Sequence, residues 1–280
     1  MILLLSMLMT LLSAEVVTPY GARDLALELG GRSFIDGYDA IRINPAGTGL
    51  LKEGEGQFGF GMDFGTYSSL SVGYVGDNGF HLIFASKDID RKFTVGSMET
   101  YAGFSTELSK WWVIGVNLGY NYLKVVNGWD MNFGIDFGPG LPTAQKTGLI
   151  GSVTIRNPFE NGGDGEVSAG LGYSYRSRLN INVDNIVIFR NKSDTGVAIA
   201  PQKRYDLVFA VESMPSEEDN FSMDVSARIS GLARDNHVQA GVGVGYVSEG
   251  FRFNVGLFFM DFTTSFFKNT QFGFSLVSGV

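Results

Sequence analysis

The sequence predicts an all-β fold: a transmembrane antiparallel β-barrel of about 14 strands with an N-terminal segment inside its lumen. Three observations support this prediction. From Glu55 onward, apolar residues alternate with small or polar ones in one segment after another. Most of these segments run for ~10–13 residues, whereas strands of globular proteins usually have ~5–6. Charged residues make up only 18% of the chain, below the usual ~25%.

The stretch VSAGLGYSY at 167–175 shows the alternation most clearly. Its apolar face carries Val167, Leu171 and Tyr173, and its other face carries only glycine and serine. A soluble sandwich would place charged and bulky polar residues on the second face. We therefore expect the apolar face to meet lipid and the small face to line a lumen. The alternative is a soluble sandwich or propeller, which would have to explain the long strands and the scarcity of charge.

The first fourteen residues, MILLLSMLMTLLSA, are almost entirely apolar. This run is too short for a membrane-spanning helix, which needs ~20 residues. It suits a signal peptide, residues 1–14, cleaved after Ala14. No Lys or Arg precedes the run, and Leu12 is large for its position, so an apolar strand or buried helix is the alternative. No later segment has the 18 consecutive apolar residues typical of a spanning helix.

Residues 15–54 form the second predicted unit, a plug in front of the barrel of residues 55–280. This segment does not alternate; glycines interrupt it, and it contains a short helical pattern around 22–29 and a turn at 44–47. It ends where the first strand begins, so it is placed to enter the barrel.

The predicted strands follow one another to the end of the chain. They cover residues 57–64, 70–74, 80–86, 98–109, 111–124, 128–138, 146–156, 166–176, 178–189, 203–213, 220–230, 235–248, 250–262 and 269–278. The alternation slips by one residue at Asp184–Asn185, which predicts a β-bulge. Trp112 and Tyr122 are ten residues apart, which at a ~40° tilt corresponds to ~25 Å, the height of the apolar band of such barrels.

The connections alternate between tight and long. Tight ones occur near 77–78, 110, 177 and 249, and longer polar ones span 87–97, 157–165 and 190–202. With an even strand count and both termini in the periplasm, the long connections lie at the outer end and the tight ones at the periplasmic end. This asymmetry is typical of outer-membrane barrels.

The period of two also predicts which charged residues face the lumen. They are Arg204, Asp206, Glu212, Asp224, Arg228 and Arg252, with Asp130, Asn132 and Asp136 on an earlier strand. Charged groups inside a membrane protein pair with one another or meet water. They therefore predict a polar pathway, a network that binds the plug, or a ladder of ion pairs that braces the wall. A hydrophobic molecule is poorly matched to this lining, so a lateral exit or a plugged lumen fits better than an open pore.

The sequence offers no catalytic or metal site. The histidines, His81 and His237, have no ligand spacing, and no nucleophile elbow occurs. With no cysteine, the chain has neither disulfides nor thiolate ligands, and its net charge of −8 argues against nucleic acid as a partner. We expect a protein that is not an enzyme and has no cofactor.

The N-terminal segment resembles that of a known family. Residues 21–31 (GARDLALELGG), 36–40, and Asn44-Pro45-Ala46-Gly47 are similar to the opening of the FadL-type outer-membrane transporters, and closer still to their smaller PorV-like relatives. The resemblance implies an N-terminal hatch inside a barrel of about 14 strands, with Asn44, Pro45 and Gly47 as hatch residues. The chain is short for a fatty-acid transporter, and its end at 272–280 lacks a terminal aromatic residue.

Two functions follow from the resemblance. In the first, the protein passes small hydrophobic, fatty-acid-like molecules across the bacterial outer membrane through a hatch-gated lumen. In the second, it is a plugged PorV-like barrel that docks secreted or surface proteins. Its partners would be outer-membrane lipid together with a hydrophobic small molecule or a protein. Transport predicts an apolar path beside the hatch, and docking predicts a sealed lumen with an apolar patch on the outer loops.

Overall fold

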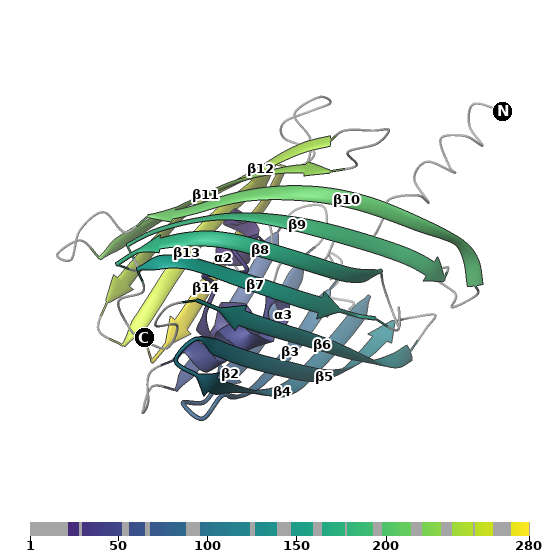
Figure 1. Cartoon of the computed structure of the whole chain (residues 1–280), viewed down its shortest axis with the longest axis horizontal. Coiled ribbons are helices and arrows are strands. Elements are labelled where there is room, and N and C mark those ends of the chain that lie inside the picture. Colours follow the sequence, from purple (N-terminus) through teal and green to yellow (C-terminus); the bar gives the residue numbers. More distant parts are fainter. Residues whose placement is uncertain are drawn as a thin grey trace.

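The computed structural model describes residues 22–27, 30–51, 56–64, 68–87, 96–123, 127–138, 147–158, 164–176, 178–192, 198–213, 220–230, 237–248, 250–259 and 270–279. Within them, fourteen antiparallel strands form one closed barrel. Short helices lie inside it (Figure 1). The predicted signal peptide, residues 1–14, lies outside the described residues.

The strands have an average length well above that of soluble sheets. They are β1 (Gln57–Phe64), β2 (Ser69–Val75), β3 (Phe80–Lys87), β4 (Ser97–Ser109), β5 (Trp112–Leu123), β6 (Asn127–Phe137), β7 (Gly148–Arg156), β8 (Gly165–Tyr175), β9 (Leu179–Lys192), β10 (Ala198–Ser213), β11 (Phe221–Ser230), β12 (His237–Ser248), β13 (Phe251–Phe259) and β14 (Thr270–Ser278).

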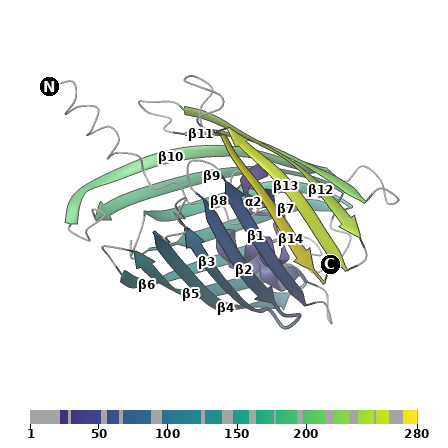
Figure 2. The ribbon, with the colours of Figure 1, turned by 180° about the vertical axis from the view of Figure 1, so that it is seen from behind.

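Each strand pairs with its sequence neighbours, and β14 closes the barrel on β1. The closing register runs from Phe58 opposite Ser278 to Phe64 opposite Phe272, and Figure 2 shows these two strands side by side. Closure leaves no strand of the sheet as an edge, which satisfies the backbone hydrogen-bonding groups that lipid could not. The predicted fold class and strand count are confirmed.

The apolar faces of the strands point outward. In β8, Val167, Leu171 and Tyr173 are exposed, whereas Ser168 and the glycines of the same strand are buried. The same alternation places the aromatic residues Trp112, Tyr120 and Tyr122 of β5 on the exterior. The barrel is therefore apolar outside and lined by small and polar residues inside, as its period of two predicts.

Two predictions about β9 and β10 are wrong. The pairing of β9 with β8 and with β10 runs unbroken through Asp184 and Asn185, so no bulge occurs there; the register shifts instead between Ala198 and Gln202. The apolar pattern breaks because Asn185 points outward and Ile186 inward. The predicted loop 190–202 is mostly strand, because the hairpin continues to Lys192 and resumes at Ala198.

The connections are sorted as predicted. The tight connections β2–β3, β4–β5, β8–β9 and β12–β13 lie at the end of the barrel where β1 begins and β14 ends. The connections β3–β4 and β7–β8, and the short one between β9 and β10, lie at the opposite end. We call these the near end and the far end.

The described residues 22–27 and 30–51 form an inner segment within the barrel (Figure 1). It contains α2 (Ala22–Ala26), α3 (Gly37–Ile43) and the 3-10 helix η1 (Pro45–Leu50). Helix α2 contacts β11–β14 and β1, α3 contacts β1–β3, and η1 contacts β4–β6. No helix in these described stretches is long and apolar enough to cross a membrane.

Wall glycines make room for the inner segment. A Cβ atom on Gly115 of β5 would overlap the backbone of Pro45, and one on Gly241 of β12 would overlap the carbonyl of Ala26. Gly256 of β13 has the same relation to Ala22. The bare lumen face seen in the sequence thus allows the backbone of the inner segment to touch the backbone of the wall.

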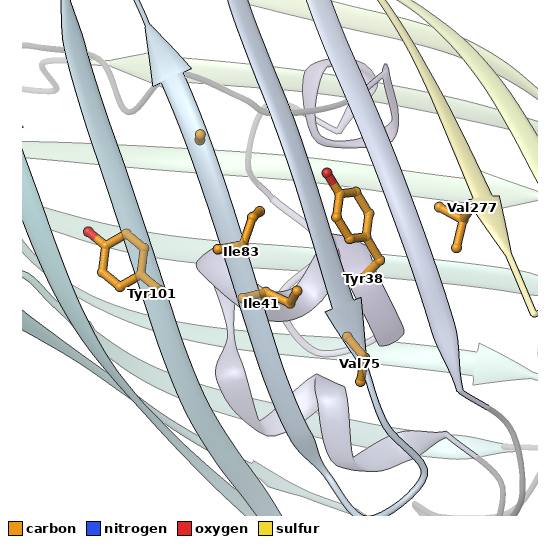
Figure 3. Packing of buried hydrophobic residues seen from close by; sticks show 7 residues of the cluster. Tyr38, Ile41, Val75, Ile83, Tyr101 and Val277 are labelled. Carbon is orange, nitrogen blue, oxygen red and sulfur yellow. The ribbon is translucent and has the colours of Figure 1, made fainter.

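Apolar contacts join the inner segment to the wall on the side of β2–β4. Figure 3 shows Tyr38 and Ile41 of α3 among Val75 and Ile83 of the wall. A second cluster packs Ala46 and Leu50 of η1 against Val113 and Ile150. The hydrophobic core of the molecule is therefore the contact between the inner segment and the barrel.

Candidate functional site

Ion pairs hold the inner segment to three separate strands of the wall. Arg23 Nη2 lies 2.7 Å from Glu212 Oε1 of β10, and Arg42 Nη2 lies 2.9 Å from Glu99 Oε2 of β4. Arg32 binds Glu166 of β8 through its Nη2. All six side chains are buried. Removing one member would leave its buried partner with less compensating charge away from water, so each pair helps to fix the position of the segment.

Arg23 is the centre of the first of these sites. Its Nη1 is 3.1 Å from Asp36 and 3.3 Å from Asp39 of the inner segment itself. Burial lowers the pKa of the guanidinium, but the surrounding carboxylates, Glu212 foremost, outweigh burial and hold the pKa well above its usual value. Burial raises the pKa of Asp39, and Arg23 and Arg252 oppose that rise.

Two wall residues predicted from the sequence complete the Arg23 site. Asp224 of β11 is buried and lies directly opposite Glu212 in the sheet. Arg252 of β13 points inward, with its Nη1 3.9 Å from Asp39 Oδ2. Glu212, Asp224 and Arg252 therefore surround the Arg23 side chain of α2 and the Asp39 side chain of α3 that it contacts.

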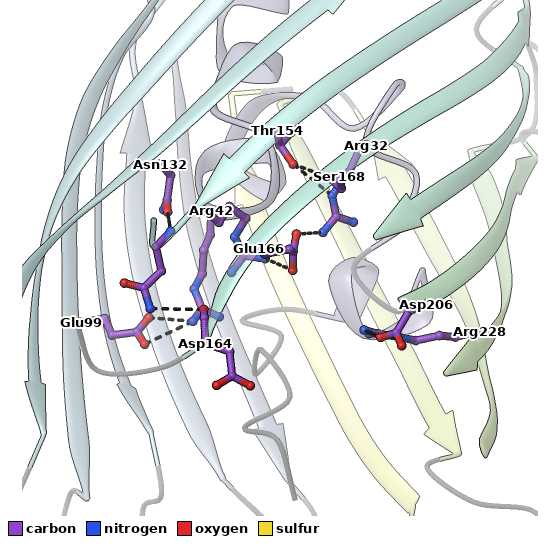
Figure 4. Close-up of polar contacts among 12 residues, drawn as sticks. Arg32, Arg42, Glu99, Asn132, Thr154, Asp164, Glu166, Ser168, Asp206 and Arg228 are labelled. Atoms are coloured by element: carbon purple, nitrogen blue, oxygen red, sulfur yellow. Dashed lines mark hydrogen bonds and ion pairs between the residues drawn. The ribbon is translucent and has the colours of Figure 1, made fainter. Parts of the chain in front are cut away.

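The second site lies around Glu166 of β8 (Figure 4). Glu166 binds Arg32, and Arg156 Nη1 of β7 lies 3.5 Å from its other carboxylate oxygen. Arg32 Nε also donates to the Thr154 hydroxyl at 3.4 Å. The Glu166 carboxylate thus forms ion pairs with one arginine of the inner segment and one arginine of the wall.

The remaining predicted residues pair within the wall. Asp206 of β10 binds Arg228 of β11, as Figure 4 shows, and Arg204 Nε lies 3.1 Å from the other oxygen of Asp206. These contacts join β10 to β11 without touching the described part of the inner segment. Asp206, Arg204 and Arg228 thus have the geometry of a wall brace, whereas Glu212 and Arg252 contact the inner segment.

Asn44 links the inner segment to β6. It precedes η1 in an extended conformation, and its Oδ1 accepts a hydrogen bond from Ala46 N at 3.2 Å. Its Nδ2 donates to Asp136 Oδ1 at 2.6 Å and to the Arg32 carbonyl at 2.8 Å. Asn44 therefore caps η1, joins two parts of the inner segment and binds the wall.

Pro45 and Gly47 shape η1. Pro45 occupies the first turn, where its missing N–H leaves no donor unsatisfied, and its carbonyl accepts from the Thr48 hydroxyl at 2.8 Å. A Cβ on Gly47 would overlap the Ile35 carbonyl. The close approach at Gly47 is therefore to another part of the inner segment.

A buried hydrogen-bond network holds η1 to β3–β5. The Thr48 hydroxyl lies 2.9 Å from His81 Nδ1 and 2.7 Å from Ser105 Oγ, and His81 Nε2 contacts Asn117 Oδ1. These side chains are all buried. Among the described residues, no group of three or more His, Cys, Asp or Glu side chains could hold a metal ion.

The sequence reasoning did not identify the arginines of the inner segment or their partners Glu99 and Glu166. Strand phase alone could have found the two glutamates, because each precedes an outward residue, Thr100 and Val167 respectively. The arginines lie outside any strand, so no periodicity marks them. Only the packed structure shows which carboxylate each one meets.

No protein-family model matches the chain, and no curated protein matches its sequence. Several solved structures share its fold. A TodX monoaromatic hydrocarbon channel with the deltaS2S3 change aligns with a TM-score of 0.68 at 11% identity, over 94% of this chain and 100% of that one. The CymD monoaromatic hydrocarbon channel aligns with a TM-score of 0.60 at 11% identity, over 96% and 99%. A Pseudomonas aeruginosa FadL homologue aligns with a TM-score of 0.60 at 9% identity, over 95% and 100%.

Proposed function

We propose that this protein is a bacterial outer-membrane channel for small hydrophobic molecules, and that its inner segment is the hatch. The fold it shares with TodX and CymD, which are described as monoaromatic hydrocarbon channels, supports this proposal. The observation that carries it is the inner segment itself, whose described residues lie across the lumen and contact the wall through ion pairs and apolar packing.

The exterior of the barrel supports the outer membrane as its location. Every strand exposes aliphatic or aromatic side chains on its outward face, including Phe84, Leu118, Leu171 and Phe209. Such a surface is stable in lipid and would be unusual in water. The near end, with the tight turns and both ends of the barrel sequence, would face the periplasm.

In the proposed mechanism, the inner segment closes the lumen and must shift to let a molecule pass. Its ion pairs are buried, but each can be exchanged for contacts with water once the segment moves. Asn44, Pro45 and Gly47 would be hatch residues because they hold η1 across the near end of the lumen, between Asp136 and the wall glycines.

A reversible lock tests this mechanism directly. Because the chain has no cysteine, a pair can be introduced at Ala26 and Gly243, where a Cβ on Gly243 would lie 2.5 Å from Ala26 Cβ. A relaxation of about 1 Å gives disulfide geometry. We expect Ala26→Cys with Gly243→Cys to reduce uptake of labelled toluene by cells under oxidising conditions, and reductant to restore it.

Each single-cysteine variant is the matched control for this lock, and its uptake should be the same under oxidising and reducing conditions. Extraction of the purified barrel for lipid mass spectrometry is an independent measurement, and a specific co-purifying hydrophobe is expected. Uptake that is the same with the lock closed and open would show that the inner segment does not gate passage.

A docking role is the second candidate. The three buried arginine–glutamate pairs favour it, because they fix the inner segment more firmly than a freely moving gate requires. In this role the lumen stays sealed and the far-end connections bind a secreted or surface protein. A stoichiometric protein partner after mild extraction, together with uptake unaffected by the lock, would support docking over transport.

A further inference from the structure

One apolar cluster in the lumen differs from the others. It consists of Ile186 and Ile188 of β9 and Val208 of β10, which we call the β9–β10 patch. The other apolar clusters among the described residues include side chains of the inner segment, such as Tyr38 with Ile83. The β9–β10 patch contains wall residues alone.

The patch arises where β9 reverses its polarity. Asn182 and Asp184 point inward, as a polar lumen requires, but the next inward residues are Ile186 and Ile188. At the same point Asn185 faces outward in a band otherwise made of residues such as Val183. Isoleucine side chains in a hydrated lumen gain nothing from water, so this stretch of wall is suited to an apolar partner.

The inner segment meets the patch with a glycine. A Cβ on Gly30 would lie 2.6 Å from Val208 Cγ1, so the backbone rests directly on the patch. Leu27 and Phe34 flank this point and pack with Ala210, the inward residue of β10 that follows Val208. The ring of Phe34 lies over Gly31, whose φ is +73°.

Charged and polar residues surround the patch. Ile186 lies opposite Asp206, Ile188 opposite Arg204, and Val208 opposite Asp184. Two residues along β9 span about 7 Å, and the neighbouring strand is about 5 Å away, which is roughly the size of one aromatic ring. Asp206 is already paired with Arg228 and Arg204, and Asp184 accepts a hydrogen bond from the Arg32 backbone N–H at 3.4 Å, so the apolar patch itself faces an uncharged ligand.

We propose that the β9–β10 patch binds a compact, uncharged hydrophobic molecule about one ring in size, and that Leu27 and Phe34 restrict access to it in the closed structure. This inference rests on the proposed channel function and adds to it a binding site and a substrate class. The patch residues are 1%, 7% and 0% exposed and Gly30 rests on Val208, so in this proposal the inner segment shifts before a ligand binds. A ligand that selects the shifted state binds more tightly when that state is more populated.

Equilibrium dialysis of labelled toluene against the purified full chain in detergent tests the proposal, with protein-free micelles as the blank. Ile188→Ser should weaken binding about tenfold or more, because it removes apolar contact with the ligand. Phe34→Ala should strengthen binding several-fold, because it weakens the closed state. Each variant is first shown to form a heat-modifiable barrel on electrophoresis.

Ile181→Ser and Phe209→Ala are the matched controls. They make the same kinds of change on the outward faces of β9 and β10, away from the contact between the inner segment and the wall, and we expect affinities within about twofold of the wild type. Equal losses in Ile188→Ser and Ile181→Ser would mean general loosening and would overturn the site. The site would also be overturned if Phe34→Ala bound toluene more weakly than the wild type, or if neither of these two proteins bound it.

A ligand series tests the substrate class. Each CH₂ that stays in apolar contact adds about fourfold in affinity. Because the proposed site holds a compact molecule, the affinity, corrected for partition into micelles, should stop rising for ligands larger than butylbenzene. A continued rise through decane would overturn the compact class. If uptake is independent of the lock while Ile188→Ser still weakens binding, the channel function fails but the site stands. If the disulfide lock controls uptake but Ile188→Ser binds toluene as the wild type does, the proposed site is overturned and the channel function stands.

Discussion

Arg23 of α2 and Glu212 of β10 form an ion pair of 2.7 Å whose side chains are 3% and 4% exposed. This pair connects the first turn of the inner segment to a wall strand far along the sequence. Because Arg23 also contacts Asp36 and Asp39, its loss would affect α2 and α3 together. The position of the inner segment depends on such pairs more than on helix propensity, since α2 is only five residues long.

Arg23→Met should destabilise the docked inner segment by ~3–5 kcal/mol, because Glu212 would be left as a buried carboxylate without its cationic partner. We expect a protease to cut the inner segment faster in this variant while the barrel stays intact. The double variant Arg23→Met with Glu212→Met should recover most of the resistance. Equal cleavage rates for wild type and Arg23→Met would contradict the role assigned to the pair.

Gly241→Val should displace α2, because a Cβ at this position overlaps the Ala26 carbonyl. Hydrogen exchange measured by mass spectrometry should become faster in residues 22–27 and stay unchanged in the strands. Ala240→Val, at the preceding, outward-facing residue, is the control and should leave exchange unaltered. The same exchange in both variants would show that close backbone contact is not required at Gly241.

Asn44→Asp is nearly isosteric but replaces a donor with a carboxylate oxygen. Asn44 Nδ2 donates to Asp136 Oδ1 at 2.6 Å, so the change places two acidic groups side by side. We expect a loss of ~2–3 kcal/mol in urea unfolding, greater than for Asn44→Ala. A loss smaller than that of Asn44→Ala would argue that Asn44 acts only as the cap of η1.

Val225→Arg tests the orientation of the wall. Val225 lies near the middle of β11 and is exposed on the exterior. An arginine on the lipid face costs ~2–4 kcal/mol near the bilayer midplane, measured by unfolding from lipid vesicles. Val225→Leu should fold as the wild type does. A negligible cost for Val225→Arg would mean that this face does not meet lipid.

The fold could be predicted because its determinants are local. A strand places alternate residues on opposite faces, so the order of Val167, Ser168 and Leu171 already separates exterior from lumen. The extent of each alternating stretch then gives the strand lengths, and the stretches between them give the tight and the long connections. The same alternation predicted that the side chains of Asp206, Glu212 and Asp224 point inward.

Long-range contacts could not be predicted in this way. Nothing local joins Arg32 to Glu166 or Asn44 to Asp136, because those partners meet only after the barrel closes around the inner segment. The bulge expected at Asp184 was wrong for a related reason: the pattern shows that polarity reverses, but only the pairing of β9 with both neighbours shows that the register does not.

The sequence by itself determined a barrel of about fourteen long strands, which face of each strand is apolar, and that a different kind of segment precedes them. Those properties depend on a period of two and on chain length. Tertiary structure alone decided how the inner segment lies across the lumen, which carboxylates bind its arginines, that Ile186 and Ile188 face inward, and that Gly30 rests on Val208. These depend on the closure of β14 on β1, which brings residues distant in the chain within contact distance.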